Sequence, residues 1–201
     1  MTGRERQLRV QRDLALALTQ ERGLAETLKL CLEGAFEVSG TQAGAIYLFQ
    51  PDTGDLVIAA HQGLSEDFLC TVRHLGPDEK PVRLVREGTP LYTRYSELPY
   101  ERPPERDREG FRSVAIVPIL HDDEAIGCLN VASRETDRIE EPERESLETL
   151  AGLIGQVIAS KRAEVALQAS EERFRKIVDH LPQLVAFTDT DLRYRYVNRT
   201  Y

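Results

Sequence analysis

The chain has 201 residues, of which 41% are hydrophobic and 30% are charged. A domain takes roughly 100–200 residues, so this length fits one full domain and part of a second. With 26 Lys and Arg against 34 Asp and Glu, the net charge is −8, which argues against general binding to a nucleic-acid backbone. No apolar run approaches the ~20 residues that a membrane-spanning helix needs.

The charged N-terminus has no signal-peptide pattern. Three widely spaced cysteines, Cys31, Cys70 and Cys128, do not make a disulfide framework. We therefore expect a cytoplasmic protein with no membrane segment in this chain and no nucleic-acid partner.

Two helices are predicted first. Residues 4–21 contain no Gly or Pro and are rich in residues that favour helices. From Leu24 to Phe36 apolar residues recur at helical spacing, and Gly40 then supplies a left-handed stop.

Strands and a short helix follow. Residues 43–49 and 56–60 are β-rich and flank a turn-forming loop longer than two residues, which predicts a hairpin. Ser65 is a typical N-cap for a short helix over 65–75. On that helix Cys70 and His74 would share one face, but two ligands are too few for a zinc site.

Residues 76–112 hold six prolines and many charges. The pattern predicts a short helix near 81–86, a short strand over 89–93 and a long loop over 95–109, of the length often seen in binding loops.

Four residues are candidates for a ligand pocket beside this segment: Tyr92, Tyr95, Arg112 and Cys128. The tyrosines and Arg112 would suit a small anionic or aromatic ligand, with Cys128 in the pocket wall. The alternative, in which the tyrosines only pack and Arg112 pairs with a nearby Glu, remains open. No catalytic residues and no metal ligands are predicted, and the sequence does not identify a cofactor.

The clearest hairpin joins residues 113–120 to 125–133 through a polar connection of four residues, and Pro118 suggests an edge position or a bulge. A helix then opens at Pro142 and meets no stop signal before about Asp179. A last hairpin is predicted from strands over 184–188 and 193–197. Helices flanking an antiparallel sheet place the chain in the α+β class.

Two stretches carry a family resemblance. QAGAIYLFQPDTGDL, GTPLY and FRSVAIVPILHDDEAIGCLNVAS resemble a GAF domain, and SEERFRKIVDHLPQLVAFTDTDLRYRYVNRTY resembles the opening of a PAS domain. The resemblance implies an N-terminal amphipathic helix over 1–22, a GAF domain over 23–160, a helical linker over 161–173 and a truncated PAS domain over 174–201.

GAF followed by PAS implies a sensory module of a bacterial two-component protein, whose output is a sensor histidine kinase lying outside these residues. The module would bind a small ligand or mediate dimerisation, with a homodimer expected through a coiled coil of its terminal helices, and it would signal to PAS and kinase domains in cis.

Alternatives remain open. The region could serve a diguanylate cyclase, or it could be a dimerisation spacer that has lost its ligand. It could also be a GAF-fold enzyme that reduces free methionine sulfoxide, although the cysteine spacing does not match those enzymes.

Overall fold

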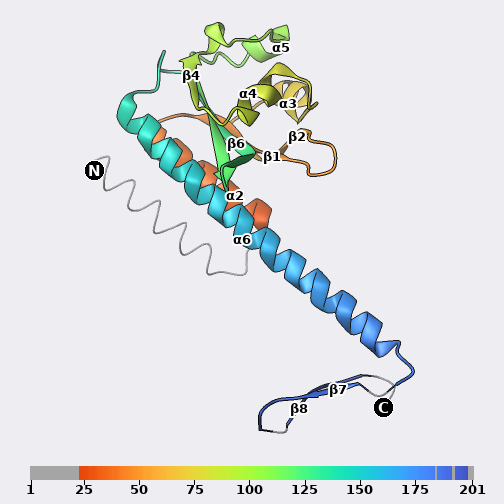
Figure 1. The fold of residues 1–201 in the computed structure, drawn as a ribbon. Coiled ribbons are helices and arrows are strands. Elements are labelled where there is room, and N and C mark those ends of the chain that lie inside the picture. Colours follow the sequence, from red (N-terminus) through yellow and green to blue (C-terminus); the bar gives the residue numbers. More distant parts are fainter. Residues whose placement is uncertain (1–22, 184, 192, 199–201) are drawn as a thin grey trace. The chain divides into compact units, whose positions relative to one another are not determined.

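A computed structural model describes residues 23–183, 185–191 and 193–198 of the chain (Figure 1). The helix predicted over 4–21, in the segment 1–22, lies outside the described residues. The chain divides into two units, Met1–Ile158 and Ala159–Tyr201, and each is described by itself.

One antiparallel sheet of six strands forms the centre of the first unit, in the order β3-β2-β1-β6-β5-β4. The strands are β1 (Ala43–Phe49), β2 (Leu56–Gln62), β3 (His74–Leu75), β4 (Leu91–Arg94), β5 (Ser113–His121) and β6 (Glu124–Ser133). Most residues of β1, β5 and β6 are buried, because helices cover both faces of the sheet (Figure 1). This observation confirms the α+β class.

The two covers come from different parts of the sequence. One face is covered by α2 (Leu24–Ser39) and by α6 (Glu141–Asp179) as far as Ile158. The other face is covered by the segment between β2 and β5, residues 63–112, which we call the cover segment. It contains α3 (Glu66–Val72), α4 (Lys80–Arg86), the 3₁₀ turn η1 (Tyr95–Glu97) and α5 (Pro104–Asp107).

Helix α6 lies very close to β5 at one glycine. A Cβ atom added at Gly155 would lie 2.3 Å from the carbonyl oxygen of Leu120, so glycine is needed for this close approach. At the end of α2, Gly40 has a φ of 66° and its N–H donates to the carbonyl of Phe36 at 2.8 Å, which confirms the predicted left-handed stop.

The hairpin of β5 and β6 is tighter than predicted. The strands continue through His121 and Glu124, so that only Asp122 and Asp123 form the turn. Both have positive φ values, 51° and 63°, which Asp tolerates and which a two-residue hairpin turn requires. Ile116 is the last residue of β5 that pairs with β4. Pro118 lies two residues further along the strand, so its missing N–H faces the side of β5 where β4 has ended, which agrees with the predicted edge position.

Two further predictions need correction. The expected loop over 95–109 contains η1 and α5 and buries several of its side chains. His74 lies in β3 rather than on α3, and its Nε2 is 3.0 Å from Asp55 Oδ2, so it does not share a helical face with Cys70. Within the described residues, no cluster of three or more potential ligands could hold a metal ion.

The second unit contains the C-terminal part of α6 and a two-stranded hairpin of β7 (Ala186–Thr188) and β8 (Tyr194–Val197). Asn198 is buried, and its side chain donates to the carbonyls of Val178 and Gln183 and accepts from the N–H of Val185. The single amide therefore ties the hairpin to the end of α6. None of the described helices combines the length and the apolar character needed to span a membrane.

Candidate ligand cavity

A cavity of about 70 Å³ lies between the sheet and the cover segment. Tyr47 of β1 and Asn130 of β6 contribute to its wall on the sheet side. Phe68 of α3, Tyr95 of η1 and Arg106 of α5 line it from the cover segment. Most of the remaining wall is aliphatic, so the cavity combines an apolar body with a few polar groups, as small-molecule sites do.

The aromatic side of the cavity is organised around Phe111. Its ring meets Phe68 edge-on at 5.7 Å and Tyr95 edge-on at 5.4 Å between centroids. The Arg134 guanidinium stacks on Phe111, 4.6 Å from the ring centroid. These contacts hold the two ends of the cover segment against each other and against the end of the sheet.

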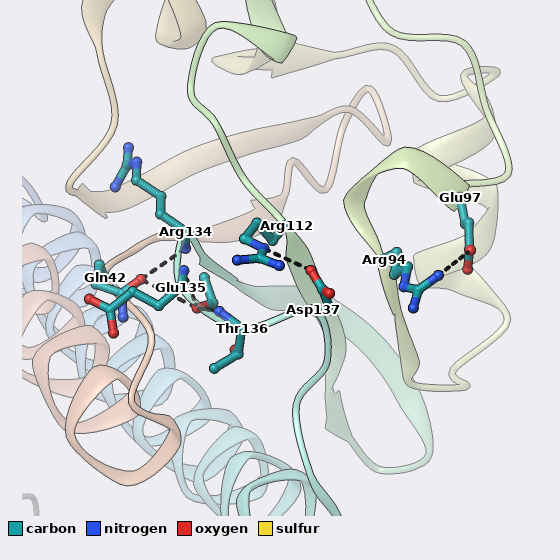
Figure 2. A network of polar contacts seen from close by, with 9 residues as sticks. Gln42, Arg94, Glu97, Arg112, Arg134, Glu135, Thr136 and Asp137 are labelled. Atoms are coloured by element: carbon teal, nitrogen blue, oxygen red, sulfur yellow. Dashed lines mark hydrogen bonds and ion pairs between the residues drawn. The ribbon is translucent and has the colours of Figure 1, made fainter.

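A polar network holds the same region from outside. Glu109 accepts a hydrogen bond from the Ser65 N–H at 2.8 Å and pairs with Arg134, which also donates to the carbonyl of Gly63 at 2.8 Å. Gln42 accepts from the backbone N–H of Arg134 at 2.9 Å (Figure 2). Burial favours the neutral form of Glu109, but its bonds to Ser65 and Arg134 prevail and lower the pKa of the carboxyl below its usual 4.5.

Arg106 is a buried cation at the cavity. It is only 8% exposed, and it donates to Thr71, from Nε to Oγ1 at 3.1 Å and from Nη2 to the carbonyl oxygen at 2.6 Å. Among the described residues it forms no ion pair with a carboxylate. A buried charge is normally paired, so Arg106 leaves a positive charge uncompensated at this wall.

Arg102 lies nearby with a different set of contacts. Its guanidinium stacks on Tyr95, 4.8 Å from the ring centroid, and donates to the Tyr95 carbonyl. Its Nε is 3.4 Å from Asp107 Oδ1, which makes an ion pair. The Nε atom itself is buried and makes no hydrogen bond in the described part of the chain. Arg102 also lines the cavity, so a second positively charged residue lies at this wall.

Three tyrosines, Tyr47, Tyr95 and Tyr100, line the cavity. None of their hydroxyls has a hydrogen bond to a described residue. Burial raises the pKa of Tyr95 and of Tyr100 to about 12 and raises that of Tyr47 further, although the positive charge of Arg106 opposes the rise in all three. The hydroxyls therefore stay protonated at neutral pH and can donate hydrogen bonds.

The structure does not bring the four predicted site residues together. Tyr95 lines the cavity, whereas Cys128 is fully buried on the same face of the sheet without reaching the cavity wall. Arg112 is half-exposed and points to Asp137, with 2.7 Å between Nε and Oδ1 (Figure 2). Arg112 is therefore ion-paired, as in the alternative to the ligand pocket, and its partner is an Asp where a Glu was expected.

Tyr92 lies on the opposite face of the sheet. It is paired with Ala115, whose side chain belongs to the core under α2 and α6. The Tyr92 hydroxyl donates to Glu148 Oε1 of α6 at 2.9 Å. Tyr92 and Tyr95 therefore face different layers, because side chains three positions apart along a strand point to opposite faces of the sheet. Tyr95 still continues the pairing of β4 with β5, since its N–H donates to the carbonyl of Arg112 at 2.9 Å.

Sequence reasoning missed Arg102, Arg106 and Asn130 as cavity residues. Asn130 interrupts the inward-facing series Cys128, Asn130, Ala132 of a strand, and a polar residue among small apolar neighbours is a recognisable signal. The two arginines gave no such signal, because the segment around them was predicted to be an irregular, charged loop.

The cysteines are dispersed. Cys31 on α2 and Cys128 on β6 are fully buried on opposite faces of the sheet, and Cys70 is exposed on α3. Burial raises the pKa of Cys31 to about 12 and raises that of Cys128 further. The two buried thiols are therefore protonated and weakly nucleophilic at neutral pH.

Known structures share the fold of this chain. The GAF domain of a phosphoenolpyruvate-protein phosphotransferase from Coxiella burnetii is 25% identical, with a TM-score of 0.69 over 81% of this chain and 98% of that chain. The GAF domain of a protein assigned as a sensor histidine kinase in Pseudomonas syringae pv. tomato is 20% identical, with a TM-score of 0.58 over 83% and 94%.

A third structure is the type II free methionine-R-sulfoxide reductase from Thermoplasma acidophilum, which is 15% identical, with a TM-score of 0.55 over 69% of this chain and 96% of that chain. No curated protein shows significant sequence similarity. The GAF domain family model matches residues 21–159, which include the sheet, the cover segment and the cavity. The chain therefore belongs to the GAF domain family.

Proposed function

We propose that this chain is the sensory GAF module of a bacterial signalling protein, which binds a small ligand in the cavity and is not itself an enzyme. The observation that carries this proposal is the buried Arg106, which lines the cavity without a carboxylate partner among the described residues. A buried charge of this kind reduces stability unless something else compensates it. A bound ligand would supply that compensation.

The signal would leave through the sheet. Successive residues of β1 face the two layers in turn: Tyr47 lines the cavity, and Leu48 packs in the core under α2 and α6. A ligand that displaces the cavity wall would therefore change the packing of α6, which continues to Asp179. In this proposal the PAS assignment of residues 174–201 and the two-component role rest on the sequence resemblance alone, and the histidine kinase output is supported also by neighbours such as the P. syringae domain.

The same proposal includes a homodimer through the terminal helices. Leu167 and Phe174 lie seven residues apart on α6, Ile177 follows three residues later, and all three are more than half exposed. This is the spacing of a coiled-coil seam, and a second copy would cover it. Sedimentation equilibrium of the whole chain should show a dimer that Leu167→Glu weakens. A monomer at high concentration would contradict this part of the proposal.

An enzymatic role, as in the Thermoplasma sulfoxide reductase, is the second candidate. It would need a thiolate near bound substrate, whereas Cys31 is separated from the cavity by the sheet and Cys128 is held as a buried thiol. We therefore favour binding without catalysis.

Thermal unfolding of the whole chain against a panel of small charged and neutral metabolites tests the ligand-binding proposal. A ligand that binds only the folded state raises the midpoint. The matched variant is Ala132→Leu, which places a larger apolar side chain in the cavity wall without changing charge. Stabilisation that the wild type shows and Ala132→Leu lacks would support binding in the cavity. A panel without effect on the wild type would contradict it.

A further inference from the structure

The chemistry of the cavity wall restricts the ligand that the proposed function requires. The wall groups that have no hydrogen-bond partner among the described residues are mainly donors: the hydroxyls of Tyr47, Tyr95 and Tyr100 and the Nε of Arg102. Donors that converge on one space are complementary to a ligand rich in acceptor oxygens. A neutral apolar molecule would leave all of them without partners.

The charges at the cavity wall also favour a ligand rich in acceptor oxygens. Arg106 brings a positive charge with no carboxylate opposite it in the described residues, and Arg102 is only partly compensated by the exposed Asp107. None of the described residues that line the cavity is acidic. The site is therefore electropositive, and the guanidinium groups match the planar, two-oxygen geometry of a carboxylate.

The volume sets the size of the ligand. The cavity measures about 70 Å³, which is smaller than the ~150 Å³ cavity that admits benzene and far below the ~300 Å³ of typical drug-sized sites. A nucleotide or a tetrapyrrole would not fit without a large movement of the cover segment. A ligand of a few heavy atoms fits the space that is present.

Asn130 supplies one more constraint. Its Oδ1 is buried and has no hydrogen-bond partner in the described part of the chain, and the residue lines the cavity from β6. This acceptor needs a donor on the ligand. An ammonium group would be repelled by Arg102 and Arg106, so a hydroxyl is the donor that fits this site.

We propose that the ligand of this cavity is a short-chain hydroxycarboxylate, with its carboxylate paired with Arg106 and its hydroxyl donating to Asn130. The tyrosine hydroxyls complete the hydrogen bonds of the carboxylate, and the aliphatic wall contacts the carbon chain. This inference rests on the proposed function, because it names the class of ligand that the sensory cavity takes.

Calorimetry and thermal unfolding of the whole chain with matched probes test the inference. Glycolate should bind more tightly than acetate, which has no hydroxyl, and glycolamide, which has no charge, should bind at least about 30-fold more weakly than glycolate. Inorganic phosphate serves as a second anion. Equal binding of phosphate and glycolate would overturn the carboxylate assignment, because an anion alone would then be sufficient.

Substitutions at the cavity wall test where glycolate binds. Arg106→Met should weaken glycolate binding by about 30-fold or more, because it removes one partner of a buried charge pair. Arg106→Lys should retain part of the affinity. The control is Arg108→Met, which removes an exposed positive charge from the same segment and should leave binding unchanged. Asn130→Leu should abolish the preference for glycolate over acetate.

The outcomes separate the inference from the proposed function. If neutral metabolites stabilise the chain and Ala132→Leu abolishes their effect, the sensory cavity stands and the hydroxycarboxylate is wrong. If neither charged nor neutral probes bind, both fail. If glycolate binds equally to wild type, Arg106→Met and Arg108→Met, the carboxylate does not sit on Arg106 and the inference is overturned.

Discussion

The two faces of the sheet are formed by the same strands but differ in what they bury. Beneath α2 and α6 the core is aliphatic, and Leu32, Ile46 and Ile154 are completely inaccessible. Beneath the cover segment the layer contains a cavity, with Arg106 buried beside it. Close packing stabilises the first face, whereas the second retains buried polar groups whose hydrogen bonds are incomplete.

This difference separates stability from function within one small domain. Groups that violate the usual rules of a core are expected at functional sites, where they reduce stability for the sake of a ligand. If that account holds, substitutions on the α2 and α6 face should change the free energy of unfolding, and substitutions at the cavity should mainly change binding.

Ile154→Ala should lower the free energy of unfolding by about 2–5 kcal/mol, because it leaves a void in a fully packed aliphatic core. The milder Ile154→Val should cost about 1 kcal/mol. Urea titration followed by circular dichroism measures both. A loss below about 1 kcal/mol for Ile154→Ala would show that this face is not the tightly packed one.

Gly155→Ala should destabilise the chain by about 1–3 kcal/mol, because its Cβ would overlap the carbonyl oxygen of Leu120. Gly152 provides the matched control on the same helix, since a Cβ there meets nothing within 4 Å. Gly152→Ala should therefore stabilise the helix by up to about 1 kcal/mol. Thermal unfolding measures the midpoints of the two variants, Gly155→Ala and Gly152→Ala. Equal shifts of the two midpoints would contradict the close approach of α6 to β5.

Glu109→Gln should cost about 2 kcal/mol at pH 7, because it removes the charge that Arg134 and the Ser65 N–H stabilise. The folded-state pKa of Glu109 lies below the usual 4.5, so its contribution is complete above that pH and is lost as pH falls through the folded value. The stabilities of wild type and Glu109→Gln should converge in acid. A constant difference from pH 7 to pH 3 would contradict this.

Arg106→Met should change the free energy of unfolding of the ligand-free chain by no more than about 1 kcal/mol. It loses two hydrogen bonds to Thr71 but also relieves a buried charge without a carboxylate partner, and the two effects offset each other. The urea titration used for Ile154 measures it. A loss above about 3 kcal/mol would show that Arg106 is structural.

Local patterns in the sequence predicted most of the fold. Ser65 caps α3 by accepting from the Phe68 N–H at 3.2 Å, and Gly40 and Pro118 also act as predicted. The turn at Asp122 and Asp123 was missed because a polar run has the same pattern whether it belongs to strand ends or to a loop.

The site was harder to predict, because its residues come together only through long-range packing. Tyr92 and Tyr95 are three residues apart, and the alternation of side chains along a strand places residues at that spacing on opposite faces of the sheet. The prediction that grouped them in one pocket overlooked this alternation. Arg106 lies in a segment rich in proline and charge, where composition predicts exposure. Its burial depends on contacts with Thr71 of α3, 35 residues away.

The ligand-induced rise in the unfolding midpoint, measured with glycolate for Arg106→Met and Ile154→Val side by side, tests the separation of the two faces most directly. We expect Ile154→Val to unfold at a lower temperature than wild type but to keep the full rise, and Arg106→Met to unfold near the wild-type midpoint but to show a much smaller rise. A full rise in Arg106→Met, or its loss in Ile154→Val, would show that binding and stability are not divided between the two faces of the sheet.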